Sequence, residues 1–404
     1  MSNPFQLTIP LKQHTPLIHF QHEQAGATLR ATEVKPKLDK YLIEHAFDSD
    51  ASKYARFLVG GKNAEHKALD YKLSVKSAVH PPEAIKRVDR EMPMFFANMG
   101  NDYQERGLIW NDDISLCIHC LHLELRDLIA NCVGEFLAAT NFGMRSTKGF
   151  GSFTLATNAP APANAYRFTV DSNDWKVVFR TIDLFYKSIR GGINGAIKPQ
   201  DGRYVKGFYM KPMIFQYAHE NQIKWEKKII KEQNIFNGEV SRQKNDHEDK
   251  VEDPDNWPLW TNKPNGRIVR DLLGLSTEQT WKGYPGDQNG ATITKEDISI
   301  DAKIDRFASP IIFKPIQVGP RFTVYFWALP IPAAYLNATF KIGVNNWEIG
   351  EFPIWDGFNI NHFLSEYLTK EKLEKAMQYD HLDRWQSGIA NLLLNIYSKL
   401  KITT

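Results

Sequence analysis

Residues that could bind a polyanion gather in one glycine-rich stretch, Asn141–Phe153 (N-F-G-M-R-S-T-K-G-F-G-S-F). Glycine lets the backbone turn through φ > 0 and lets a ligand approach bare N–H groups, and basic side chains beside such amides suit phosphate oxygens. The stretch lacks P-loop spacing and follows a helix, so a polyanion is favoured over a mononucleotide. The alternative is a glycine-rich turn with two solvated charges. The residues concerned are Gly143, Arg145, Ser146, Thr147, Lys148, Gly149 and Gly151.

A second basic stretch runs from Lys187 to Lys211 and contains six Lys or Arg residues but one acidic residue, Asp201. Aromatic residues are interleaved with it, which suits pairing with a nucleic-acid backbone and stacking on bases. We therefore predict contact with RNA or DNA here, the alternative being an ordinary exposed loop. The candidate binding residues are Arg190, Lys198, Arg203 and Lys206.

The first predicted helix carries cations near its N-terminus. Thr32 is predicted to cap this helix, and Pro36 places the start near Glu33, because proline is tolerated in the first turn. Lys35 and Lys37 then oppose the helix macrodipole unless an anion binds there. The alternative is a solvated helix start whose lysines extend into water.

A Cys117-x-x-Cys120 pair, with His119 and His122 beside it, has the spacing of half a zinc site. A structural site needs four converging ligands, and the odd spacing on a predicted strand sends the two cysteines to opposite faces. The pattern therefore favours core or edge residues, and we predict no metal.

Composition indicates a soluble protein of 404 residues, long enough for two domains, with 42% hydrophobic and 24% charged residues. The net charge is only +3, so any basic surface must be local. The three cysteines fit a reducing compartment. Neither a signal peptide nor an apolar run of membrane-spanning length is evident, so we expect a cytoplasmic protein without a membrane partner.

The predicted elements of the first half follow the order β-α-β-β-α-β, which is that of a ferredoxin-like, RRM-type fold. The segment from Ser77 to Trp110 is too long for a plain connection and is predicted to be a hairpin insertion. The predicted strands are Phe5–Leu11, Ala68–Val75, Asp113–Leu121 and Ser152–Thr157, and the helices run from about Glu33 to Ala46 and from His122 to Thr140.

A Pro/Ala-rich linker, residues 158–165, is predicted to separate the halves. We predict an α+β protein with two ferredoxin-like halves carrying insertions, residues 1–157 and 166–345, and a C-terminal helical segment, residues 346–404. Further predicted strands are Tyr166–Val170, Asp301–Pro315 and Arg321–Leu329; further helices are Asp174–Ser188, Lys224–Phe236, Arg267–Leu273 and two between Asn361 and Leu400.

Several strings together resemble the RAMP superfamily of CRISPR-associated RNA-binding proteins: L-R-A-T-E-V-K-P-K-L-D-K-Y-L, F-L-V-G-G-K and M-R-S-T-K-G-F-G-S-F. The resemblance is closest to the subunit of the Cmr (type III-B) effector complex that lies toward the 3′ end of the guide RNA. Thr15-Pro16-Leu17 and Arg30–Leu38 stand where that subunit has T-P-L and a basic helix start. Its glycine-rich loop maps onto Thr140–Ser152, and Arg306–Pro315 resembles one of its strands. Thr140-Asn141 and Pro36 replace family glycines.

This resemblance implies two ferredoxin-like folds, no metal or organic cofactor, and RNA held through its backbone. It implies a non-catalytic subunit in antiviral defence, with guide RNA, target RNA or both and other CRISPR effector subunits as partners. Phe150 is then either a stacking side chain or the hydrophobic plug of the loop. The implied RNA-binding residues are Arg30, Lys35, Lys37, Arg145, Ser146, Lys148, Gly149, Phe150 and Gly151.

The alternative is a metal-independent endoribonuclease, because some RAMP relatives cut guide RNA precursors with a histidine as general acid or base. His14, His19 and His22 are the candidates for that role. A backbone subunit of this kind can also carry a cleaving aspartate on a thumb-like loop, and Asp102, Asp112 and Asp113 lie at the predicted insertion.

Overall fold

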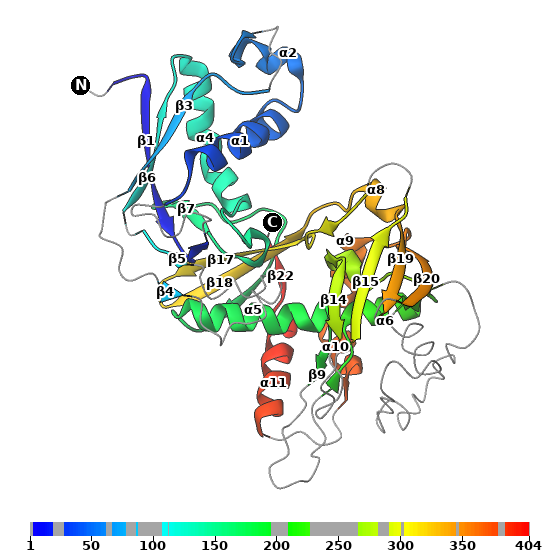
Figure 1. Cartoon of the computed structure of the whole chain (residues 1–404). Helices are drawn as coiled ribbons and strands as arrows, with labels where there is room; N and C mark the ends of the chain where they lie inside the picture. The colour runs from blue at the N-terminus through cyan, green and yellow to red at the C-terminus, as the bar shows by residue number, and fades with distance from the viewer. Residues whose placement is uncertain are drawn as a thin grey trace. The chain divides into compact units, whose positions relative to one another are not determined.

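The computed structural model describes residues 3–18, 28–61, 67–77, 86–87, 107–111, 113–194, 209–226, 266–281, 291–299, 303–344, 347–378 and 384–403. Helices are combined with small, mainly antiparallel sheets, so the fold is α+β, as the sequence predicts (Figure 1). Internal packing divides the chain into two compact units. Unit 1 is Met1–Asp183, Ile312–Trp327 and Lys399–Thr404, and unit 2 is Leu184–Ile311 and Ala328–Ser398.

The first sheet of unit 1 has the strand order β3-β6-β1-β7, and all of its pairs are antiparallel. In the chain, helix α1 comes between β1 and β3, and helix α4 comes between β6 and β7. The predicted elements of this half are therefore present in the predicted order. Their bounds are β1 Gln6–Gln13, α1 Ala31–Tyr41, β3 Lys72–Ser77, β6 Ile114–His119, α4 Leu123–Ala139 and β7 Phe153–Leu155.

Strand and helix periods build the core of this sheet. Ile9 and Leu11 alternate on β1, and Leu125, Ile129 and Val133 recur every four residues on α4, and all five are buried. Burial of each such side chain contributes about 1.5–3 kcal/mol. The core thus fixes both ends of the loop that joins α4 to β7.

Helix α1 begins at Ala31, two residues before the predicted start at Glu33, and its N-cap is Arg30 rather than Thr32. The Arg30 carbonyl accepts hydrogen bonds from the amides of Glu33 and Val34, both at 3.0 Å. Pro36 therefore lies in the second turn rather than the first. A five-residue π-helical turn, Leu42–Ala46, and a short helix α2, Ala51–Tyr54, follow.

The predicted hairpin insertion contributes two described strands, β4 (Lys86–Arg87) and β5 (Gly107–Ile109), which pair antiparallel. β5 also pairs with β2 (Leu17–Ile18), so the three strands form a small sheet in the order β2-β5-β4. Asp102 and Asp112 lie outside the described residues.

The second sheet of unit 1 has the order β17-β18-β8-β22. The predicted strand Tyr166–Val170 is confirmed without change as β8, and helix α5 follows it at Trp175–Arg190. Thr403, next to β22, donates to the Pro162 carbonyl and accepts from the Ala165 amide, which holds the end of the predicted linker. The other bounds are β17 Ile311–Val318, β18 Arg321–Ala328 and β22 Lys401–Ile402.

Unit 2 contains a four-stranded sheet in the order β14-β15-β19-β20 and three smaller sheets, β21-β10-β9, β11-β12 and β13-β16. The β strands are β9 Ile193–Asn194, β10 Tyr209–Met210, β11 Lys224–Trp225, β12 Gly266–Arg267, β13 Leu275–Ser276, β14 Glu278–Trp281, β15 Ala291–Asp297, β16 Arg306–Phe307, β19 Thr339–Val344, β20 Trp347–Pro353 and β21 Met377–Gln378. The helices are α6 Met213–Glu220, a 3-10 turn Arg270–Leu273, α8 Ala333–Leu336, α9 Ile360–Tyr367, α10 Lys370–Ala376 and α11 Arg384–Ser398.

Four predictions for this part of the chain differ from the structure. Arg267 lies in strand β12, so the predicted helix Arg267–Leu273 is reduced to the 3-10 turn Arg270–Leu273. The predicted strand Asp301–Pro315 is divided between β16 and β17. Lys224–Trp225, the described start of the predicted helix Lys224–Phe236, is strand β11, which pairs in parallel with β12. The C-terminal region contains three helices rather than two, because the Thr369 side chain caps a separate α10 by accepting from the Lys372 amide. No helix among the described residues has the length and apolar character needed to cross a membrane.

Candidate nucleic-acid interface

The glycine-rich loop, residues 140–152, joins α4 to β7 in unit 1. Its tip, residues 143–148, is half-buried, whereas its base is almost wholly buried. Arg145 (φ 58°) and Gly149 (φ 98°) both adopt the left-handed conformation and flank a 3-10 turn, Ser146–Lys148. This geometry presents the side chains of the turn at the partly exposed tip of the loop.

The glycines of the loop make room for the protein's own atoms. A Cβ atom at Gly151 would lie 2.0 Å from the Phe142 carbonyl oxygen, and one at Gly149 would lie 2.8 Å from Cδ of Pro315. The Gly151 amide donates to the Pro16 carbonyl at 2.9 Å. The sequence predicts that these glycines allow both a turn through φ > 0 and the approach of a ligand; in the structure Gly149 and Gly151 have positive φ and also make room for the protein's own atoms.

The Thr15-Pro16-Leu17 segment fixes the base of the loop. The Thr15 hydroxyl donates to the Gly149 carbonyl at 2.7 Å and accepts from the Ser152 amide at 3.0 Å. One residue after the segment, the Ile18 carbonyl accepts from the Met144 amide at 2.9 Å. The threonine-proline-leucine motif therefore determines the shape of the loop.

Strand β17 anchors the loop from a distant part of the sequence. The Lys314 amine donates to the carbonyls of Thr140 and Phe153, at 2.7 and 2.9 Å, which lie at the two ends of the loop. The Asn141 amide side chain donates to the Phe313 carbonyl at 2.7 Å. Lys314 is fully buried, and this burial lowers its pKa well below the usual value of a lysine.

The lysines of α1 take part in ion pairs within the protein. Lys35 pairs with Asp39 at 2.7 Å and donates to the Leu69 carbonyl at 2.9 Å. Lys37 pairs with Glu33 at 2.8 Å and donates to the Asn141 carbonyl at 3.1 Å.

The same Glu33 carboxylate accepts from the amide of Gly143, at 2.9 Å. This bond and the bond from Lys37 to the loop attach the N-terminal turns of α1 to the glycine-rich loop. Arg30, the N-cap of α1, is half-buried. The structure therefore brings the predicted helix start and the predicted loop together.

Phe150 is fully buried and stacks on Phe179 of α5, with ring centroids 4.2 Å apart and an interplanar angle of 18°. Of the two roles considered from the sequence, this position corresponds to the hydrophobic plug. The plug fixes the loop beneath its tip, because its ring faces another buried ring.

The predicted basic stretch Lys187–Lys211 is described only at its ends, and Lys198, Arg203 and Lys206 lie outside the described residues. Arg190 lies in unit 2, where its guanidinium donates to the Gly274 carbonyl and approaches Asp271 at 3.7 Å. Only 20% of its side chain is exposed. Arg190 thus belongs to a buried charge cluster, which consists of Arg190, Glu226, Asp271 and Lys295.

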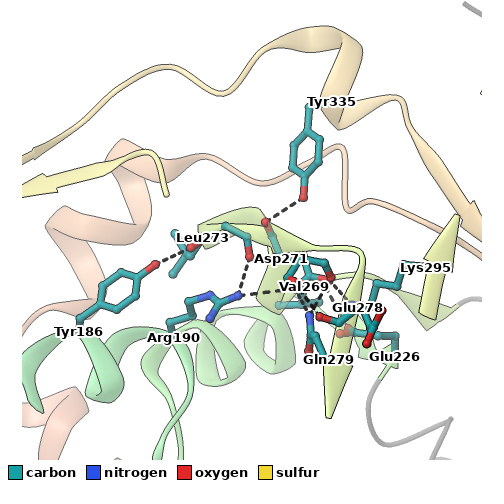
Figure 2. Close-up of polar contacts among 12 residues, drawn as sticks. Tyr186, Arg190, Glu226, Val269, Asp271, Leu273, Glu278, Gln279, Lys295 and Tyr335 are labelled. Carbon is teal, nitrogen blue, oxygen red and sulfur yellow. Dashed lines mark hydrogen bonds and ion pairs between the residues drawn. The ribbon is translucent and has the colours of Figure 1, made fainter. Parts of the chain in front are cut away.

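Figure 2 shows the side chains of this buried charge cluster converging around Asp271. Lys295 forms an ion pair with Asp271, and Tyr335 donates to the Asp271 carbonyl at 2.8 Å. Burial alone would raise the pKa of Asp271, but Lys295, Arg190 and Arg270 outweigh it and hold this pKa below its usual range.

Burial raises the pKa of the neighbouring Glu226 carboxyl to about 7. Glu226, Asp271 and Lys295 are each at most 5% exposed, so a substrate cannot reach them. The buried charge cluster therefore joins elements of unit 2 to one another and does not form an open active site.

His14, a candidate for catalysis in the alternative function, is buried beside the loop. Its Nδ1 accepts from the Gln317 amide at 3.1 Å, so its Nε2 carries the proton and donates to the Thr154 hydroxyl at 2.8 Å. Burial, with Lys314 and Lys12, lowers the pKa of His14 to about 3. His14 is thus a neutral structural residue, and His19 and His22 lie outside the described residues.

Cys117 and Cys120 are both buried, and Cys120 donates to the His122 carbonyl at 3.2 Å. Within the ranges that the structure describes, no three His, Cys, Asp or Glu side chains are grouped so as to hold a metal ion. Asp113 follows the insertion and is exposed. The cysteines therefore lie in the core, as the strand pattern predicts.

Comparison with known proteins gives two family matches that together span most of the chain. A model described as the Cmr1 N-terminal domain matches residues 4–193, and one described as the Cmr1 C-terminal domain matches residues 209–393. The chain is also similar to the crystal structure of Cmr1 from Pyrococcus furiosus in its apo form, with a TM-score of 0.39 and 10% identity over 81% of this chain and 90% of that one. A search of the curated proteins found none that matches.

Proposed function

Because the chain belongs to the Cmr1 family of Cmr (type III-B) RAMP subunits, we propose that it holds guide RNA, target RNA or both within a type III-B CRISPR effector complex, without cutting RNA itself. The observation that carries this proposal is the glycine-rich loop, whose buried base presents Arg145, Ser146 and Lys148 on a partly exposed tip.

The loop is suited to phosphate because its base is fixed before any ligand arrives. The amides of Ser146 and Thr147 open the 3-10 turn, where the first amides have no acceptor within the turn itself, and Arg145 and Lys148 flank them in the chain. Amides and cations in one fixed turn can pair with successive phosphates and do not read sequence. A loop shaped in advance loses little conformational entropy on binding, which favours affinity.

Arg30 extends this surface, because it caps the helix whose Glu33 contacts the loop. Lys35 and Lys37, which pair with Asp39 and Glu33, contribute positive charge to the same surface. Gly149 and Gly151 act by shaping the turn.

We further infer that both halves have the ferredoxin-like topology. The first half runs β1-α1-β3-β6-α4-β7 with the sheet order β3-β6-β1-β7. The second sheet has the order β17-β18-β8-β22, and in the chain α5 follows β8 while α11 precedes β22. In both sheets the strand that comes first in the chain, β1 or β8, lies between the third (β6 or β18) and the fourth (β7 or β22), as the βαββαβ motif requires. The remaining elements of unit 2 are then insertions, which together with the C-terminal helices offer surface to other effector subunits.

The endoribonuclease alternative has less support, because His14 is buried and neutral and donates its proton to Thr154. A general base must reach the proton that it abstracts, and His14 cannot. Incubation of the purified protein with repeat RNA in the absence of metal checks the alternative, including His19 and His22. A discrete cut that a histidine-to-alanine change abolishes would favour the endoribonuclease.

The binding proposal is tested by the double variant Arg145→Ala/Lys148→Ala. Each phosphate contact contributes about 0.7 to the slope of log K against log salt for single strands, so the slope should fall by about 1.4 and affinity should drop most at low salt. The charge-matched control is Lys370→Ala/Lys375→Ala, two exposed lysines on α10. Fluorescence anisotropy over a salt series measures the affinity and the salt slope of the loop variant and of the control variant. An unchanged slope in the loop variant would overturn the proposal.

A further inference from the structure

A row of aromatic side chains leads from the plug of the glycine-rich loop to the surface of unit 1. Phe150 stacks on Phe179, Phe179 meets Trp175 edge-on at 5.9 Å between ring centroids, and Trp175 lies 6.3 Å from Trp110. The first two rings are fully buried, Trp175 is half-buried and Trp110 is 42% exposed. The row therefore begins under the loop and ends in a tryptophan pair, Trp110 and Trp175, that water reaches.

Trp110 and Trp175 are more exposed than two core tryptophans, Trp225 and Trp355. Trp225 and Trp355 are at most 8% exposed, as expected of a large ring that packs in a core. Trp110 and Trp175 are tilted by 58° to each other, so neither ring covers the other's face as a parallel stack would. Val177, on the same helix as Trp175, is also exposed, at 37%. A partly open aromatic surface with two ring faces at an angle results.

The cationic residues that follow Trp175 on α5 favour a nucleic acid as the occupant of this surface. Lys176 and Arg180 follow Trp175 on α5, and Asp174 precedes it. Cations that pair with phosphates, next to rings that stack on bases, are the combination that single-stranded nucleic acid recognition uses.

We propose that Trp110 and Trp175 form a stacking platform for an unpaired base of the RNA whose phosphates lie at the glycine-rich loop; this rests on the proposed function. The loop supplies contacts to the backbone, and the tryptophan pair supplies an uncharged contact to a base elsewhere on the same strand. Every base has an aromatic face, so the platform accepts any sequence but requires the strand to be unpaired there.

The platform is tested with Trp110→Ala, because Trp110 lies at the exposed end of the row and makes no contact with the plug. Loss of one base–aromatic stack should raise Kd for fluorescein-labelled oligouridine about 5- to 100-fold, with an unchanged salt slope because no phosphate contact is lost. Trp110→Phe should restore most of the affinity. The matched control is Leu121→Ala, an exposed apolar residue (67%) at the start of α4, which should not alter Kd.

A second measurement locates the base directly. Ultraviolet crosslinking of RNA that contains 5-iodouridine, followed by mass spectrometry, should give adducts on the peptides that hold Trp110 or Trp175. An unchanged Kd in Trp110→Ala and no such adduct, with the Arg145→Ala/Lys148→Ala slope still reduced, would overturn the platform and leave the proposed function standing. An unchanged slope in the loop variant would instead remove the proposed function as well.

One further outcome would reassign the tryptophan pair. If Trp110→Ala bound oligouridine normally but no longer co-purified with other effector subunits, the pair would be a protein contact, and the platform would be overturned. Exposed tryptophans are common at protein interfaces, so this comparison is part of the test.

Discussion

Replacement of Lys314 by methionine tests how strand β17 holds the glycine-rich loop. Methionine has a similar length and suits the apolar surroundings, but it cannot donate to the carbonyls of Thr140 and Phe153. One of these carbonyls is buried and the other is partly buried, and a buried acceptor without a donor costs about 1–3 kcal/mol. We therefore expect the free energy of unfolding to fall by roughly 2–4 kcal/mol above pH 10.5, where the wild-type amine is neutral in the unfolded chain as well as in the folded one.

The size of this effect should depend on pH. Burial lowers the pKa of Lys314 in the folded protein well below 10.5, the ordinary value that applies to the unfolded chain. Between the folded-state pKa and 10.5, the unfolded chain therefore binds a proton that the folded chain does not. Wild-type stability then rises with pH, by at most about 1.4 kcal/mol per unit. Methionine does not titrate, so the destabilisation of Lys314→Met should grow as pH rises toward 10.5 and shrink as pH falls.

Urea unfolding at several pH values between about 7 and about 9 measures the difference between the two proteins. The control is Lys72→Met, because Lys72 is an exposed lysine on β3 and its replacement should change the free energy of unfolding little. A difference for Lys314→Met that stays constant with pH would show that the buried amine keeps its proton, and the reasoning from burial would be refuted.

Two further predictions concern the loop and unit 2. Gly151→Ala should be destabilised by several kcal/mol more than Gly319→Ala in thermal unfolding. The two glycines have similar φ angles (64° and 60°), but only a Cβ at position 151 meets a carbonyl oxygen, at 2.0 Å. Equal losses of stability in the two variants would contradict this steric argument. Wild-type stability should include a contribution from Glu226 that is complete below its ordinary pKa of 4.5 and lost as pH rises through about 7. The stability of Glu226→Gln, measured by urea unfolding, should not show this decline. Parallel pH profiles of stability for the wild type and the variant would argue against a raised pKa.

The sequence predicted those features that local patterns determine. Strand β8 was predicted to the residue, because Tyr166–Val170 is bounded by turn residues and rich in side chains that favour strands. Helix α4 and the position of the glycine-rich loop were predicted for the same kind of reason. The T-P-L string was noticed as a resemblance, and the structure adds the physical cause, which is the pair of hydrogen bonds made by the Thr15 hydroxyl.

The remaining features depend on partners that are distant in the chain. Arg190 belongs to a basic stretch, yet Asp271 draws it into a buried cluster. Lys314 was missed as a residue of the loop, because its partner Thr140 is 174 positions away. The one available signal was a single lysine within the apolar string I-I-F-K-P, where a charge has to find acceptors or lose its proton.

Because Lys314 of strand β17 holds the glycine-rich loop but comes much later in the chain, the loop is synthesised before the residue that holds it. Lys314 follows Phe153 by 161 residues, so at ~5–20 residues per second the anchor is made roughly 8–30 s after the loop that it holds. During that interval the nascent chain carries Arg145 and Lys148 without the support that fixes their turn. A product that terminates before β17 has the basic residues of the loop but lacks the hydrogen bonds from Lys314 that hold its two ends, so the loop is completed late in synthesis.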